Sequence, residues 1–327
     1  MDLETLIGAQ LVVGIPGTTA TQEVLDHLRA IHAGGFIAFE RNFESPEQFR
    51  RLLGQLEDAL GRTLLAMVDH EGGRVVRFSS GVTHFPDALT VGTTKPPEDV
   101  ARQGAIEAKE LKALGVDVNL APCVDVLVKG ADPVIGTRSY GSDPQRVAAM
   151  GVARIQGLQR GGVAACAKHF PGIGAVPKDP HTHLPTIGLD WPAMRTVHLV
   201  PFVAAIQAGV ATIMSSHVCY SQLDPANQPA TFSARLIRDL LRQELGFQGV
   251  CLSDDLEMGA LRSLVPIGEA AMRAVEAGHE ALLVCSDLRA QREVFEALRN
   301  AYREGRLSQS ELEHSVERIE PLKARPS

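Results

Sequence analysis

Eight short apolar segments, rich in β-branched residues, alternate along the chain with segments whose apolar residues recur at the helical period. This alternation predicts parallel strands joined by helices that cover the sheet. We expect strands at 11–14, 36–39, 64–68, 116–120, 163–167, 211–215, 250–253 and 281–284. Eight strand–helix repeats within 327 residues indicate an α/β fold of the closed (β/α)8 barrel (TIM barrel) type.

The connections between these segments have different lengths at the two ends of the predicted barrel. Every helix-to-strand connection is short and contains glycine, a residue that ends helices because it adopts the left-handed conformation without strain. The strand-to-helix connections after strands three to seven are much longer, at 69–97, 125–143, 168–192, 216–233 and 254–266. Barrels of this class carry their sites at the elaborated carboxyl end, so we expect the functional residues there.

The chain contains no low-complexity tract and no linker typical of a domain boundary. We therefore predict a single domain over 1–327. Its barrel core covers about 8–290, and a C-terminal helical extension covers 288–325, with a break near Gly305.

Composition excludes several classes of protein. The net charge of −7 and the absence of a Lys/Arg block argue against a nucleic-acid partner. The five cysteines have no paired spacing, and Cys166, Cys251 and Cys285 lie in apolar segments, which is typical of buried thiols in a reducing compartment. Residues 1–16 lack the pattern of a signal peptide, and no stretch is apolar enough to span a membrane, so we expect a cytoplasmic protein. Aromatic residues are few, which favours a small ligand over a long polymer.

Ionisable residues gather on the loop after the fifth predicted strand. The loop begins Lys168-His169-Phe170-Pro171-Gly172 and continues through Asp179-Pro180-His181-Thr182-His183. Polar side chains on a loop held by a rigid scaffold are typical of active sites. Other predicted strand ends add polar residues, namely Glu40-Arg41-Asn42, Asp69-His70-Glu71, Asp125, Ser216-His217, Asp254-Asp255 and Ser286-Asp287. Arg77, Arg138 and Lys168 would balance the negative charge.

Asp254 and Asp255 follow the seventh predicted strand directly. Because side chains alternate along a strand, only one of the two can face the barrel axis. A carboxylate in a sugar site can attack an anomeric carbon and form a covalent intermediate. The alternative is a structural role, with Asp255 accepting hydrogen bonds as a helix N-cap. Both interpretations can hold at once.

Asp179 and His181 are two residues apart on the same loop. A carboxylate fixes the tautomer of a neighbouring imidazole and raises its basicity, and an imidazole titrates near neutral pH, which suits a group that first donates and then accepts a proton. The alternative is loop capping by Asp179 beside an exposed histidine. A metal site built from His169, His181, His183 and Asp254 is a weaker hypothesis, because no His-x-His pair lies on a strand.

Six ordered motifs resemble the single-domain, cell-wall-recycling β-N-acetylglucosaminidases (β-N-acetylhexosaminidases) of bacteria in glycoside hydrolase family 3. They are Gly35–Asn42, Val68–Phe78, Asn119–Val126 around the Ala121-Pro122 pair, Ile135–Tyr140, the Lys168–Gly172 loop and Gly249–Met258. Together they cover about 35–258, which is far more specific than a lone pattern.

The resemblance implies a (β/α)8 barrel hydrolase that needs no metal or organic cofactor. It implies Asp254 as nucleophile and His181 as acid/base, assisted by Asp179. It implies that the terminal N-acetylglucosamine is bound by Asp69, Arg77, Arg138, Lys168 and His169. It further implies a small sugar substrate of the N-acetylglucosaminyl-anhydro-muropeptide type, cleaved in peptidoglycan recycling. Because a neutral imidazole repels anions less than a carboxylate does, phosphate would compete with water as the acceptor.

Three residues depart from the family pattern. Ile173 replaces the second histidine of Lys-His-Phe-Pro-Gly-His-Gly, Pro180 replaces the serine of Asp-Ser-His, and His70 replaces a glutamine. Pro180 fixes its own φ and restricts Asp179. These departures leave open three alternatives: a sugar-binding barrel with little turnover, a β-glucosidase of the same fold, and a metal-dependent barrel hydrolase.

Overall fold

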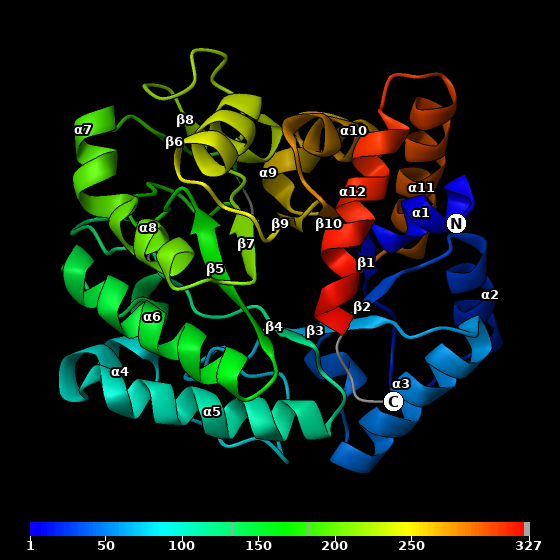
Figure 1. Cartoon of the computed structure of the whole chain (residues 1–327), viewed down its shortest axis with the longest axis horizontal. Coiled ribbons are helices and arrows are strands. Elements are labelled where there is room, and N and C mark those ends of the chain that lie inside the picture. Colours follow the sequence, from blue (N-terminus) through cyan, green and yellow to red (C-terminus); the bar gives the residue numbers. More distant parts are fainter. Residues whose placement is uncertain (132–133, 182, 324–327) are drawn as a thin grey trace.

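A computed structural model describes residues 1–131, 134–181 and 183–323 of the protein. Eight parallel strands close into a barrel in the order β1-β10-β9-β7-β5-β4-β3-β2 (Figure 1). They are β1 (Leu11–Val13), β2 (Gly35–Ala38), β3 (Leu65–Val68), β4 (Val118–Asn119), β5 (Ala164–Phe170), β7 (Thr212–Ser215), β9 (Val250–Asp255) and β10 (Ala281–Val284). The predicted fold class is confirmed.

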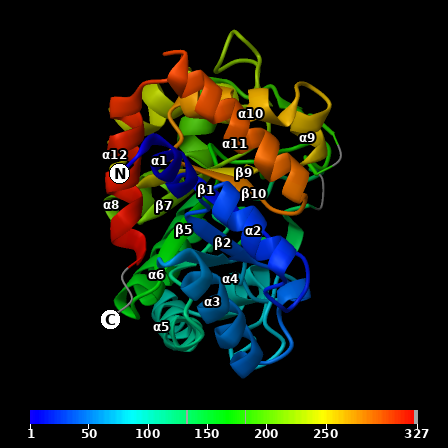
Figure 2. The same cartoon turned by 90° about the vertical axis from the view of Figure 1, so that its right-hand side faces the viewer.

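Helices surround the barrel (Figures 1 and 2). The α-helices are α1 (Leu3–Ala9), α2 (Gln22–Ala30), α3 (Pro46–Leu60), α4 (Ala88–Thr94), α5 (Pro97–Ala113), α6 (Pro144–Arg160), α7 (Trp191–Ala193), α8 (Val200–Gln207), α9 (Gly259–Arg262), α10 (Ile267–Ala277), α11 (Leu288–Arg303) and α12 (Gln309–Ile319). Two π-helical segments, η3 (Met194–His198) and η5 (Arg235–Glu244), and four 3-10 turns, η1 (Glu40–Asn42), η2 (Gly136–Arg138), η4 (Ala230–Phe232) and η6 (Glu320–Lys323), complete the set.

Local sequence explains where the helices begin and end. For α3, the Ser45 side chain accepts a hydrogen bond from the Gln48 N–H and Pro46 occupies the first helical position. The same helix ends at Gly61, whose φ of 64° is left-handed and therefore suits a residue without a Cβ atom.

Alternation along the strands sorts the side chains into two sets. Val250 and Leu252 of β9 belong to the cluster inside the barrel, together with one or two apolar residues from each of the other strands. Cys251 instead packs with the cluster between the sheet and the helices. Asp254 continues the inward series of Val250 and Leu252, so the period of two directs its carboxylate toward the barrel axis.

The C-terminal helix α12 closes one end of the barrel. Its Ile319 is fully buried and joins the interior cluster. Leu283 and Cys285 belong to the same cluster and line the cavity at the opposite, carboxyl end. The barrel interior is therefore packed from the helix at one end to the cavity floor at the other, and a ligand can enter only at the carboxyl end.

Several elements were not predicted. Helix α1 precedes the first strand, and α4 lies inside the connection after the third strand, which the sequence indicated as loop. The long connections after β5 and β7 contribute a two-stranded parallel sheet formed by β6 (Thr186–Ile187) and β8 (Cys219–Tyr220). The last two residues of the predicted extension, 324–325, lie outside the described residues. Within the described ranges, the model contains no helix with the length and apolarity needed to cross a membrane.

Candidate active site

A cavity of about 380 Å³ lies at the carboxyl ends of the strands. All eight site residues predicted from the sequence line it, namely Asp69, Arg77, Arg138, Lys168, His169, Asp179, His181 and Asp254. Two of the residues that depart from the family pattern, Ile173 and Pro180, line it as well. The loops after five strands thus bring these side chains to one place, while their individual roles stay predictions.

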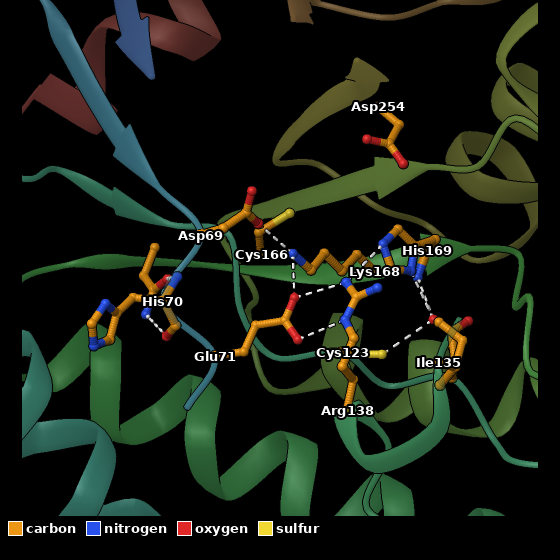
Figure 3. A network of polar contacts seen from close by, with 12 residues as sticks. Asp69, His70, Glu71, Cys123, Ile135, Arg138, Cys166, Lys168, His169 and Asp254 are labelled. Atoms are coloured by element: carbon orange, nitrogen blue, oxygen red, sulfur yellow. Dashed lines mark hydrogen bonds and ion pairs between the residues drawn. The ribbon is translucent and has the colours of Figure 1, made fainter. Parts of the chain in front are cut away.

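Four alternating charges form the wall of the cavity (Figure 3). The Lys168 ammonium lies 2.5 Å from Asp69 Oδ1 and 2.7 Å from Glu71 Oε1. The Arg138 guanidinium donates to both oxygens of Glu71, at 2.9 and 2.8 Å. Burial alone would lower the pKa of Lys168, but the two carboxylates outweigh it and hold that pKa above its usual value. The wall therefore keeps two cations charged in a nearly dry environment.

His169 is fixed by a buried carboxylate behind it. Its Nδ1 lies 2.8 Å from Asp125 Oδ2, and the Ile173 N–H donates to Asp125 Oδ1 at 2.7 Å. An ionised carboxylate only accepts hydrogen bonds, so Nδ1 carries the proton and Nε2 is an acceptor. That Nε2 lies 3.4 Å from Arg138 Nη2 and faces the cavity. Asp125 thus sets the tautomer with which His169 meets a ligand.

Asp254 lies apart from this network, and no drawn interaction joins it to the ion pairs (Figure 3). One of its oxygens accepts the Asp255 N–H at 2.8 Å. Burial raises the pKa of Asp254, but the nearby His217 and His169 outweigh it and leave that pKa below its ordinary value. The carboxylate is therefore ionised at neutral pH with an oxygen left for a ligand.

Asp255 has a different environment although it also borders the cavity. Its Oδ1 accepts the N–H groups of Glu257 at 3.1 Å and of Cys285 at 3.2 Å. It is not the cap of α9, whose N-cap is Met258, so the predicted helix-capping role is replaced by a tie between the ends of β9 and β10. Burial raises the pKa of Asp255 to about 7.

This raised pKa predicts how the Asp255→Asn variant changes stability with pH. The folded protein binds the Asp255 proton more tightly than the unfolded chain, whose aspartate pKa is about 3.9. Wild-type stability therefore rises relative to the variant as pH falls from about 7 toward about 4, and above that window the ionised Asp255 is a net cost. We expect Asp255→Asn to raise the free energy of unfolding at pH 8 and to lose this advantage at pH 4. Urea denaturation at both pH values measures it, and an advantage that grew at low pH would contradict the assignment.

The loop that carries Asp179 and His181, here called the flap (residues 168–192), lies over the cavity. His181 Nδ1 is 2.6 Å from Asp179 Oδ1, and the same oxygen accepts the His181 N–H at 2.8 Å. Burial raises the pKa of Asp179, but these two hydrogen bonds outweigh it and lower the pKa below its ordinary value. The His181 side chain is 59% exposed, so its ring is open to incoming ligands and water. Residue 182, between the two histidines of the predicted His-x-His pair, lies outside the described residues.

Two backbone hydrogen bonds attach the flap to the loop that carries Asp254. The Gly259 N–H donates to the His181 carbonyl at 3.0 Å, and the Ala260 N–H donates to the Pro180 carbonyl at 3.3 Å. Both donors belong to the first turn of α9, where N–H groups have no partner inside the helix. The positions of the imidazole and of the strand-end carboxylate are therefore coupled through the backbone.

The remaining predicted residues have clear places. Arg77 donates to Glu40 at 3.1 Å on the rim, which leaves it close to the cavity. His70 points away from the cavity into the core, where burial lowers its pKa to about 3. The substitution at His70 thus alters the packing behind the site and leaves the lining of the cavity unchanged.

Sequence reasoning left Glu71, Asp125 and His217 out of the site. The His217 ring is buried, with Nδ1 2.7 Å from Thr231 Oγ1 and Nε2 2.9 Å from the Asp255 carbonyl, so it braces the end of β9. All three were visible as polar residues at strand ends. Their function as supports of Lys168, His169 and Asp254 depends on contacts between distant loops, which no local pattern records.

The predicted metal set is not gathered in the structure. Among residues 1–131, 134–181 and 183–323, donor atoms within 4.8 Å of one another occur in Cys123, Asp125 and His169, and not in His169, His181, His183 and Asp254. The two flap and wall imidazoles are instead hydrogen-bonded to carboxylates.

Comparison with known proteins agrees with this geometry. The model of the glycosyl hydrolase family 3 N-terminal domain matches residues 5–322. A beta-hexosaminidase of Nitrosomonas eutropha is 39% identical over 285 residues, which are 85% of this chain and 80% of that protein. A family 3 β-N-acetylglucosaminidase of Paenibacillus sp. strain FPU-7 superposes with a TM-score of 0.96 at 36% identity, where 99% of this chain covers 62% of that longer chain. NagZ of Neisseria gonorrhoeae, solved in complex with N-trifluoroacetyl-D-glucosamine, superposes with a TM-score of 0.80 at 31% identity over 96% of this chain and 98% of that one.

Fold, cavity and relatives together define a class, the barrel glycoside hydrolases. Within that class, the chain belongs to glycosyl hydrolase family 3. The family resemblance and the enzyme class predicted from the sequence are confirmed, and the curated relatives quoted above carry the name beta-hexosaminidase.

Proposed function

We propose that the protein is a β-N-acetylhexosaminidase that removes a terminal β-linked N-acetylglucosamine and retains the configuration of the anomeric carbon. The observation that carries this proposal is the lining of one cavity by an ionised strand-end carboxylate, Asp254, and a hydrogen-bonded pair of carboxylate and imidazole, Asp179 and His181. The Neisseria relative in complex with N-trifluoroacetyl-D-glucosamine supports a substrate of this class.

In the first step, the Asp254 carboxylate attacks the anomeric carbon while the protonated His181 ring gives its proton to the leaving oxygen. The C–O bond to the leaving group breaks, and a covalent glycosyl–Asp254 ester forms. In the second step, neutral His181 takes a proton from water, the water oxygen attacks the anomeric carbon, and the ester breaks. Two inversions give net retention, and phosphate would compete with water at the second step.

The wall of charges binds the sugar in this proposal. Asp69, Lys168 and His169 offer acceptors and a cation at the cavity, and Arg138 and Arg77 extend the polar surface. The natural substrate is proposed to be N-acetylglucosaminyl-anhydro-muropeptide, cleaved in the cytoplasm during peptidoglycan recycling.

The test uses three substrates with purified protein. Aryl β-N-acetylglucosaminide should release its aryl alcohol with and without a chelator, aryl β-glucoside should react much more slowly, and muropeptides should release free N-acetylglucosamine. Binding of N-acetylglucosamine without turnover would favour a sugar-binding barrel. Faster cleavage of the glucoside would favour a β-glucosidase, and chelator-sensitive activity on an amide or ester would favour a metal-dependent hydrolase.

The His181→Ala variant should separate leaving groups by their need for a proton. General acid catalysis contributes on the order of 10²–10⁴-fold when the leaving group is poor. We therefore expect a loss of that order on a natural aglycone and a much smaller loss in kcat/KM on a nitrophenyl substrate, whose leaving group departs without protonation. Steady-state kinetics over a series of aryl leaving groups measures this, and equal losses across the series would contradict the assignment.

The exposed His183 offers a matched control on the same flap. His183→Ala should keep the leaving-group dependence of wild type, because His183 does not line the cavity.

A further inference from the structure

Three side chains behind the cavity combine the donor atoms of a soft-metal site. Cys123, Asp125 and His169 are all buried, and one donor atom from each lies within 4.8 Å of the other two. Cys123 Sγ is 3.3 Å from Asp125 Oδ2, which is 2.8 Å from His169 Nδ1. The proposed mechanism gives the thiol no role. Figure 3 shows the thiol beside Arg138 and on the far side of the wall from Asp254.

The spacing of these atoms is close to that of a tetrahedral site. Zinc binds sulfur at about 2.3 Å and nitrogen or oxygen at about 2.0–2.2 Å, so its ligand atoms lie about 3.3–3.6 Å apart. The sulfur–oxygen distance of 3.3 Å already falls in this range. The nitrogen–oxygen distance has to open by only about 0.5 Å to reach it. Thiolate, imidazole and carboxylate together suit zinc or cadmium better than magnesium or calcium.

The backbone holds the three residues in this arrangement. Cys123 pairs with Lys168, the neighbour of His169, in a parallel bridge between the segments after β4 and β5. Asp125 is held independently by the N–H groups of His169 at 3.2 Å and Ile173 at 2.7 Å. Because the carboxylate is oriented without the thiol, the site is organised before a metal arrives.

We propose that Cys123, Asp125 and His169 form an inhibitory site for zinc and related soft divalent cations, reached through the sugar cavity. On binding, the Cys123 thiol gives its proton to solvent and the sulfur becomes a ligand. The His169 proton moves from Nδ1 to Nε2 as Nδ1 becomes a ligand, and an Asp125 oxygen is the third. One proton is released for each metal bound, and solvent supplies the fourth ligand.

The tautomer shift explains why this metal inhibits without filling the cavity. In the metal-free protein, His169 Nε2 accepts hydrogen bonds and lies 3.4 Å from the donor Arg138 Nη2. With a metal on Nδ1, neutral imidazole carries its proton on Nε2, so two donors face each other and a sugar hydroxyl loses its acceptor. This consequence rests on the proposed function of His169 in sugar binding, whereas the metal site itself does not.

Cobalt binding and zinc inhibition test the proposal on the full-length protein after chelator treatment. Titration with Co²⁺ should give a thiolate-to-cobalt charge-transfer band that saturates at one equivalent, and Zn²⁺ should displace the cobalt and release one proton. Zn²⁺ should inhibit aryl β-N-acetylglucosaminide cleavage with slow onset, N-acetylglucosamine should delay that onset, and a chelator should reverse it.

The Cys123→Val variant should lose the charge-transfer band. It should weaken zinc inhibition by at least about 100-fold, since even the loss of an outer partner of a metal ligand costs 10–100-fold. Its metal-free activity should match wild type. Cys219→Val removes another buried thiol that does not line the cavity and should keep both the band and the inhibition.

No thiolate band in wild type, or a band that persists in Cys123→Val, would overturn the proposal. Zinc inhibition that is unchanged in Cys123→Val would also overturn it. If wild type cleaves no glycoside, the proposed function fails, while the cobalt band and the proton count still decide the metal site.

Discussion

Asp254→Asn should lose on the order of 10⁴-fold or more in kcat on an aryl β-N-acetylglucosaminide, the scale of loss seen when a catalytic nucleophile is removed. The amide has nearly the same shape as the carboxylate but cannot form the glycosyl ester. The inward series of Val250 and Leu252 in β9 continues at this position, so the substitution should leave the fold intact. Steady-state kinetics and the thermal midpoint measure the two expectations.

The neighbouring aspartate gives the matched control. Asp255 Oδ1 accepts two backbone N–H groups, and an asparagine oxygen can do the same. Asp255→Asn should therefore keep far more activity than Asp254→Asn. The opposite ranking would assign the nucleophile to Asp255 and refute the assignment made from strand alternation.

Chemical rescue adds a readout that a purely structural role would not give. Asp254→Gly leaves space at the anomeric carbon, and azide should restore cleavage of an activated aryl substrate by attacking that carbon directly. A single displacement inverts the centre, so the product should be the α-glycosyl azide. A β-azide, or no rescue in a variant that still binds N-acetylglucosamine, would count against a covalent Asp254 intermediate.

The features that could be predicted from the sequence are those encoded locally. The eight strands and most helices follow from hydrophobic period, and the long carboxyl-end loops follow from the positions of glycine. The direction of Asp254 follows from a period of two within one strand. Helix α4 was missed because seven residues in a connection rich in glycine and proline give too short a periodic signal, and strands β6 and β8 have only two residues each.

The supports of the site could not be predicted in this way. Asp125 meets His169 across 44 positions, and Glu71 meets Arg138 across 67. These contacts depend on the paths of two irregular loops at once. Buried polar groups need partners, so a partner for Lys168 was expected, but which carboxylates would supply it depended on the loop conformations. Glu71 thus emerges only from the structure, and its importance can be measured.

Glu71→Gln should destabilise the fold by about 3–5 kcal/mol, the usual cost of removing one partner from a buried ion pair. The Glu71 carboxylate is 6% exposed and is shared by Lys168, which is 2% exposed, and Arg138, which is 12% exposed. Asp69 alone would then balance two buried cations. The KM for the sugar substrate should rise as well, because Lys168 and Arg138 lose the group that fixes their positions at the cavity wall.

The Arg77–Glu40 pair supplies the comparison. It has a similar distance of 3.1 Å, but its carboxylate is 69% exposed. Solvent screens such a pair, so Glu40→Gln should cost no more than about 1 kcal/mol. Urea denaturation of both variants at neutral pH measures the difference, and equal costs would show that Glu71 contributes no more than a surface charge.

The pH dependence of the same measurement identifies the cause. Burial raises the pKa of Glu71, but Arg138 and Lys168 outweigh it and hold that pKa well below its ordinary value. The stability it contributes is therefore fully present above the unfolded value of about 4.3 and is lost as pH falls below it. The gap between wild type and Glu71→Gln should be largest near neutral pH and should narrow as pH falls below about 4.3. If the gap were instead constant with pH, the loss would arise from packing, and the charge of Glu71 would not be what holds the wall together.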